Sequence, residues 1–73
     1  MENTHNLENT PNYEIADIVK LRSNPNYKHM PSALLITEVH WAALWFYKCI
    51  DLTTNTLRTY SCYHVEQRYV KVA

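Results

Sequence analysis

The sequence predicts a mainly β fold of five short strands, and three observations support that prediction. Residues with high β propensity gather in short runs near residues 14–22, 33–41, 44–52, 57–64 and 69–72. Polar segments with Asn, Pro, Ser or Thr separate most of these runs. The chain has 73 residues, of which 47% are hydrophobic. This is the length of one small domain, with an apolar fraction typical of folded proteins.

The first 12 residues, MENTHNLENTPN, differ from the rest of the chain because they are almost entirely polar. Leu7 is their only apolar residue beyond Met1. Such a segment cannot offset the entropy lost on ordering, so we expect a flexible tail over residues 1–12 and a folded domain over residues 13–73. The segment lacks the features of a signal peptide, and no apolar run approaches the roughly 20 residues needed to cross a bilayer. We therefore expect a cytoplasmic protein without membrane contact.

The first strand is predicted near residues 14–22, because Ile18 and Val19 lie in a β-branched run there. The Ser23–Asn26 segment, SNPN, then predicts a turn. The chain contains no glycine. Positions that require a positive φ should therefore fall to asparagine, the next most tolerant residue. The candidates are Asn24, Asn26 and Asn55.

Residues 33–49 fit two structures. Ile36, Thr37 and Val39 favour a strand near residues 33–41, followed by a loop over 41–44 and a second strand. The alternative is one helix, because Leu35, Val39, Ala42 and Phe46 also recur at helical spacing and Ser32 is a suitable N-cap. We favour the two strands.

The segments near residues 44–52 and 57–64 are predicted to form a hairpin around a polar turn. Centring the turn on Thr54 and Asn55 places Cys49 opposite Tyr60 and Tyr47 opposite Cys62. Apolar residues then occupy both faces of the hairpin, because side chains alternate along a strand. We therefore expect both faces to be covered, one by the protein's own barrel and the other by something else.

The predicted order of one strand, a long loop, a three-strand meander and a short last strand resembles that of a small five-stranded SH3-like barrel. The residues that carry this resemblance are YEIADIVKLRS at 13–23, WFYKCIDL at 45–52, LRTY at 57–60 and VEQRYVKV at 65–72. The opening strand is similar to that of small uncharacterised bacterial proteins of the YodC type, and to KOW and Tudor-like modules. Ala16 stands where YodC-type proteins usually have glycine. The resemblance spans residues 13–72 and implies a fold but no particular activity.

The sequence shows no clear metal, cofactor or catalytic motif. Cys62 and His64 are the only close Cys/His pair, and Cys49 is a third possible ligand without an obvious fourth. Alternatively, either cysteine could act as a nucleophile with His40 or His64 as its base. A small barrel, however, leaves little room for the sequestered pocket that such a site needs. The acidic residues are scattered over different elements. We therefore expect free thiols, no metal, no cofactor and no enzyme activity.

Aromatic residues with basic neighbours are the best binding candidates in the chain. Aromatic rings and guanidinium planes stack on bases, surround cations or line peptide grooves. About half of the nine aromatic residues should instead fill the core. The candidate binding residues are Trp41, Trp45, Phe46, Tyr60, Tyr63, Arg58 and Arg68.

The balance of 7 basic and 7 acidic residues argues against nonspecific binding to duplex nucleic acid. The sequence therefore favours a non-catalytic binding or adaptor module that acts through protein contacts. The aromatic run WAALWFY at residues 41–47 indicates self-association into a homo-oligomer. Two alternatives remain open. One is a KOW- or Tudor-like nucleic-acid binder, and the other is a bacterial or phage protein that sequesters a small ligand between subunits.

Overall fold

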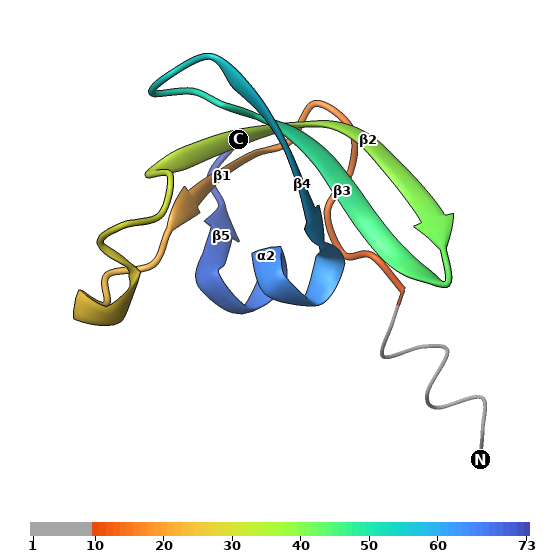
Figure 1. Cartoon of the computed structure of the whole chain (residues 1–73), viewed down its shortest axis with the longest axis horizontal. Coiled ribbons are helices and arrows are strands. Elements are labelled where there is room, and N and C mark those ends of the chain that lie inside the picture. The colour runs from red at the N-terminus through yellow and green to blue at the C-terminus, as the bar shows by residue number, and fades with distance from the viewer. Residues whose placement is uncertain (1–9) are drawn as a thin grey trace.

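The computed structural model describes residues 10–73, and within them the predicted mainly β fold is confirmed. Five strands form one antiparallel sheet in the order β4-β3-β2-β1-β5, with the short helix α2 against one face (Figure 1). The strands are β1 (Ile18–Leu21), β2 (Ala33–Ala42), β3 (Leu44–Asp51), β4 (Thr56–Ser61) and β5 (Tyr69–Lys71). A 3₁₀ turn, η1 (Pro25–Tyr27), follows β1, and α2 (Cys62–Arg68) connects β4 to β5.

The sheet does not close into the expected barrel. Strands β4 and β5 are its two edges and do not pair with each other. Helix α2 contacts both of these strands and β3, so it covers the region where a closing pair of strands would lie. Residues 1–9 of the predicted tail lie outside the described residues. Asn12 is held against α2, since its backbone N–H and its side-chain amide both donate to Glu66.

Residues 33–49 form the two strands β2 and β3, so the single-helix alternative is wrong. The pairing shifts at Thr37, because Ile36 pairs with Cys49 whereas Glu38 pairs with Lys48. The Thr37 hydroxyl donates to the Lys48 carbonyl at this bulge (3.0 Å). The extra residue reverses which side chains face the core, as a bulge does.

Three residues adopt a positive φ within the described chain: Ala16 (80°), Ala43 (68°) and Asn55 (59°). The prediction for Asn55 is confirmed. The prediction for Asn24 is wrong, because this residue is extended and its side chain accepts from the Asn26 backbone N–H (2.8 Å). Asn26 lies in η1 and is not among the positive-φ residues either. Pairing between strands imposes the positive φ on both alanines. Ala43 is the single residue that joins β2 to β3, and the Ala16 N–H donates to the Ile36 carbonyl (2.8 Å).

Replacing Ala16 or Ala43 with glycine should stabilise the protein. A Cβ atom costs about 1–2 kcal/mol in the left-handed region, and glycine removes that cost. Glycine also raises the entropy of the unfolded chain, which offsets part of the gain. We expect each variant to gain about 0.5–1 kcal/mol in urea unfolding. Ala42→Gly is the matched control and should lose stability, because Ala42 lies in a strand and has no positive φ.

The register of the β3–β4 hairpin differs from the prediction by two residues. Tyr47 pairs with Tyr60, and Cys49 pairs with Arg58. The cause is Asp51, whose carboxylate accepts the Thr53 N–H (2.9 Å) and whose carbonyl accepts the Asn55 N–H (2.7 Å). This closes a four-residue turn. Because the shift is an even number of residues, the paired side chains remain on the predicted faces.

Two strand ends differ from the prediction by more than one residue. The first strand begins only at Ile18, since the Asp17 N–H donates to the Glu14 carbonyl in a preceding turn. Strand β4 ends at Ser61, and the residues from Cys62 onward turn into α2. The Ser61 hydroxyl is the N-cap and accepts the His64 N–H (3.1 Å).

The core lies between the sheet and α2. It contains Val19, Leu34, Ile36, Tyr47, Cys49, Cys62, Val65 and Tyr69. Tyr13, Trp45 and Tyr60 pack against it, so about half of the aromatic residues serve the core, as expected. Both cysteines are free and buried, in agreement with the predicted free thiols.

The buried thiols predict a loss of stability at alkaline pH. Burial raises the pKa of Cys49 to about 12 and that of Cys62 to about 11, from an ordinary value of 9.0. Above pH 9 the unfolded chain releases thiol protons that the folded protein retains, so unfolding becomes more favourable as pH rises. We expect the urea midpoint to fall between pH 9 and 11. Cys62→Ala should reduce this dependence and leave the part that Cys49 contributes, and an unchanged slope would contradict the assignment to the Cys62 thiol.

Candidate functional site

A pocket of about 400 Å³ lies between the tip of the β2–β3 hairpin and α2. The hairpin contributes Ala43, Leu44 and Trp45, and the β4–α2 junction contributes Ser61 and Cys62. Tyr63 and Glu66 complete the lining from α2. We call this the hairpin-tip pocket. It forms because Ala43 turns the chain within one residue, which places the large side chains that follow it close to the start of the helix.

Glu66 is the only carboxylate among the described residues that line the hairpin-tip pocket, and three neutral donors hold it in place. The Tyr47 hydroxyl donates to Oε2 (2.5 Å), as does the Asn12 backbone N–H (2.8 Å). The Asn12 side-chain amide donates to Oε1 (3.1 Å). Burial, and then the hydrogen bond to Glu66, raise the pKa of Tyr47. Glu66 was not among the sequence candidates, because its partners lie 19 and 54 residues away and leave no local signal.

The structure brings three of the predicted aromatic residues together at this end of the molecule. Trp45 and Tyr63 line the hairpin-tip pocket, and Tyr63 is 71% exposed. Trp41 meets Trp45 edge to face, with 5.5 Å between ring centroids. Two others lie elsewhere. Phe46 points to the opposite face of the sheet and packs on His40, whereas Tyr60 stacks on His64.

The two predicted arginines lie outside the hairpin-tip pocket and already have partners. Arg58 pairs with the buried Asp51 carboxylate, with 3.8 Å between Nη2 and Oδ2. The Arg68 guanidinium lies 5.7 Å from the centre of the Tyr27 ring and donates to the His64 carbonyl.

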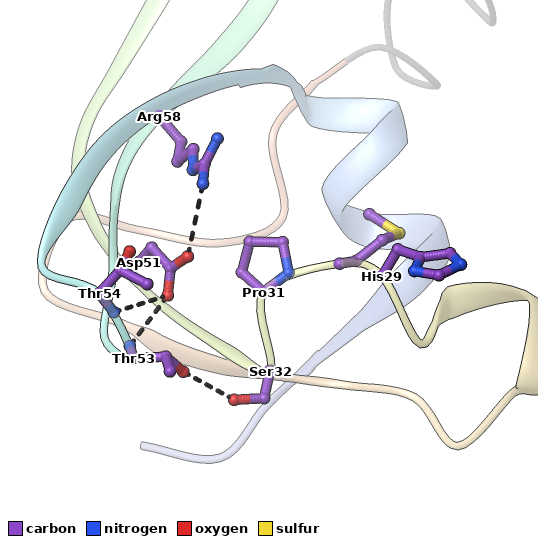
Figure 2. Close-up of a pocket in the computed structure, with 8 residues that line it drawn as sticks. His29, Pro31, Ser32, Asp51, Thr53, Thr54 and Arg58 are labelled. Carbon is purple, nitrogen blue, oxygen red and sulfur yellow. Dashed lines mark hydrogen bonds and ion pairs between the residues drawn. The ribbon is translucent and has the colours of Figure 1, made fainter.

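A second pocket, of about 410 Å³, lies between residues 29–32 and the β3–β4 turn (Figure 2). Figure 2 shows Arg58 directed at Asp51, while the Asp51 carboxylate accepts the backbone N–H groups of Thr53 and Thr54. These hydrogen bonds, that of Thr53 first, lower the pKa of Asp51. The Ser32 and Thr53 hydroxyls also bond to each other (3.0 Å). Asp51, Arg58, Thr53 and Ser32 of this pocket thus bond to one another or to the turn backbone and brace the turn.

The face of the sheet opposite α2, here called the outer face, carries a continuous apolar row. Ile18 pairs with Leu35, Leu35 pairs with Ile50, and Ile50 pairs with Leu57, so one side chain from each of four strands lies in line. The core residues Val19, Leu34 and Cys49 are their strand neighbours, which places the row on the other side. Leu57, at the β4 end of the row, is 75% exposed.

Among residues 10–73, no three His, Cys, Asp or Glu side chains are grouped as a metal site would require. The described chain also has no helix long and apolar enough to cross a membrane. No protein-family model matches the sequence, and no curated protein or solved structure shows significant similarity to it.

Proposed function

We propose that this chain is a non-catalytic binding module that acts through protein contacts and self-association. The observation that carries the proposal is the apolar row on the outer face, which ends at the exposed Leu57. A row of four aliphatic side chains that α2 leaves uncovered marks a surface for another protein. The two free thiols suit a reducing, cytoplasmic location.

The two edge strands of the sheet differ in how well they are protected from pairing with a second chain. Strand β5 has only three residues, and its Lys71 is paired with Asp17 (3.4 Å). Strand β4 has six residues, no proline, and Arg58 as its single charge. Arg58 points away from the outer face and is tied to Asp51. Strand β4 therefore lacks the charges and prolines that usually protect an edge.

These features together indicate a second copy of this chain as the occupant of the β4 edge. Two β4 strands paired antiparallel about a twofold axis keep both outer faces on the same side. The apolar row then continues from one copy into the next through Leu57. Trp41 and Trp45 of the aromatic run contribute less to this contact, because Trp45 packs against the core and Trp41 is paired with it, on the side of the sheet away from the outer face.

The oligomeric state of a Leu57 variant tests this proposal. We expect the protein to sediment as a dimer at micromolar concentration, and Leu57→Glu to weaken association at least tenfold, because two like charges would meet at the axis. The folded monomer should tolerate the change, since Leu57 is 75% exposed. Leu52→Glu is the matched control, because Leu52 lies in the turn and outside the row. A monomeric parent protein would refute self-association, and a dimeric Leu57→Glu variant would refute the β4 contact.

The nucleic-acid alternative has weaker support in the arrangement of basic side chains. Arg58 is paired with Asp51 and Arg68 is placed over Tyr27. Arg22 donates to the backbone carbonyls of Glu66 and Gln67. With a net charge of zero, few cations remain to neutralise phosphates.

A further inference from the structure

We infer that the hairpin-tip pocket binds an arginine side chain of a partner protein. The inference rests on the proposed action through protein contacts and names the chemistry that one such contact would recognise. The hairpin-tip pocket reaches β4 only at Ser61, the last residue of that strand, and none of its lining residues belongs to the apolar row.

The charge of the hairpin-tip pocket favours a cation. Glu66 has no ion-pair partner among residues 10–73, and its three hydrogen-bond donors are uncharged. Arg22, the nearby cation, binds the Glu66 backbone carbonyl and not the carboxylate. A carboxylate offers about four lone-pair sites, so one at Oε1 remains after these three bonds. A charged donor at that site would form the stronger, charge-assisted kind of hydrogen bond.

The walls of the hairpin-tip pocket favour a cation with an apolar stem. Trp45, Leu44 and Tyr63 supply two aromatic rings and an aliphatic side chain. Leu44 is 46% exposed and Tyr63 is 71% exposed, so both are accessible from solvent. Aromatic faces attract cations, and methylene groups pack on them at the same time.

Size and geometry select arginine from the cationic groups. A volume of about 400 Å³ is near the lower end for ligand pockets, which suits one long side chain. The guanidinium is planar and weakly hydrated, so it stacks on a ring while donating in its own plane to a carboxylate. The ammonium of lysine is compact and strongly hydrated, and gains less from the aromatic walls.

The test is an NMR titration of the full chain with four acetylated, amidated pentapeptides that differ only at their central residue. That residue is arginine, lysine, norleucine or glutamate, and the Trp45 indole N–H signal reports binding. We expect the arginine peptide to bind about tenfold more tightly than the norleucine peptide, with lysine between them. Equal affinity for arginine and norleucine, or no shift at about 10 mM of the arginine peptide, would overturn the inference.

Two variants separate recognition from folding. Glu66→Gln removes the charge and keeps one of the two acceptor oxygens, so the arginine preference should fall to about threefold or less, the part that the aromatic walls supply. Glu38→Gln is the control, because Glu38 is an exposed carboxylate on β2 that pairs with Lys48 and should leave the preference unchanged. Tyr63→Ala removes an exposed wall without disturbing the core and should weaken arginine binding about threefold or more. Retention of the full preference by both Glu66→Gln and Tyr63→Ala would refute the site.

The inference and the proposed function can fail separately. The titration is repeated on the Leu57→Glu variant, which is expected to be monomeric. Arginine binding by that variant supports the pocket whatever the fate of the β4 contact. A dimeric parent protein that shows no arginine preference would remove the pocket and leave the self-association proposal intact.

Discussion

Tyr47→Ala is expected to unfold most of the protein at room temperature. The side chain is fully buried in the core, and its ring stacks on Tyr13 with 6.0 Å between centroids. Removing a buried aromatic side chain costs about 3–5 kcal/mol. A chain of this length has a total stability of roughly 4–11 kcal/mol, and a small domain is expected near the lower end. Far-UV circular dichroism against urea measures the loss.

Tyr47→Phe isolates the contribution of the hydroxyl. That group donates to Glu66 and accepts the Tyr13 backbone N–H (2.9 Å), so it ties β3 to both α2 and residue 13. Its loss leaves the Tyr13 N–H without this acceptor and removes one of the three hydrogen bonds to Glu66, at a cost of about 1–3 kcal/mol. Tyr63→Phe is the matched control and should change stability by less than about 0.5 kcal/mol, because Tyr63 is on the surface. Equal effects of the two Phe variants would refute the role given to the Tyr47 hydroxyl.

Tyr69→Ala is the second substitution expected to have a large effect, again about 3–5 kcal/mol. Tyr69 begins β5, is fully buried, and donates its hydroxyl to the Pro31 carbonyl (2.7 Å). It thereby fixes the long β1–β2 connection to the end of the chain. Hydrogen exchange should show residues 22–32 losing protection before the β2–β3 hairpin does.

The Tyr69→Phe variant should cost about 1–3 kcal/mol, because the Pro31 carbonyl then loses its partner. Val72→Ala tests whether any change near the C-terminus has the same effect, since Val72 is 58% exposed and follows β5. We expect that variant to retain the parent stability. A loss of stability in Val72→Ala as large as that in the Tyr69 variants would show that Tyr69 has no special role.

The order and number of strands were predictable from the sequence, because β propensity and turn residues act locally. The runs that became β2 and β3 are rich in β-branched and aromatic residues, and this local preference decided against the helix. The positive φ of Asn55 was also predictable, since in a chain without glycine asparagine is the residue that best tolerates a left-handed turn position. Which side chains of β3 and β4 share a face of the hairpin followed from strand alternation alone.

Helix α2 left a signal that the strand interpretation of residues 57–64 overlooked. Cys62, Val65 and Tyr69 recur at helical spacing, and Ser61 precedes them as an N-cap. Tyr60 and Cys62, which lie two residues apart, suggested a longer strand instead. The helix is favoured because it buries Cys62 and Val65 against the sheet. It thereby covers the region between β4 and β5, the two edge strands that do not pair with each other.

Only the tertiary structure determined the β2–β3 register, the strained turns and the hairpin-tip pocket, because each depends on contacts between different elements. The Thr37 bulge sets which side chains of β2 and β3 meet. The β3–β4 register is instead set locally, by the Asp51 turn. Ala16 and Ala43 take a positive φ against their own preference, since pairing with other strands imposes it. Glu66 meets Asn12 across 54 residues, a contact that no local pattern encodes. The sequence by itself therefore determined which segments are strands and which side chains are apolar, whereas long-range packing decided which of them surround a common site.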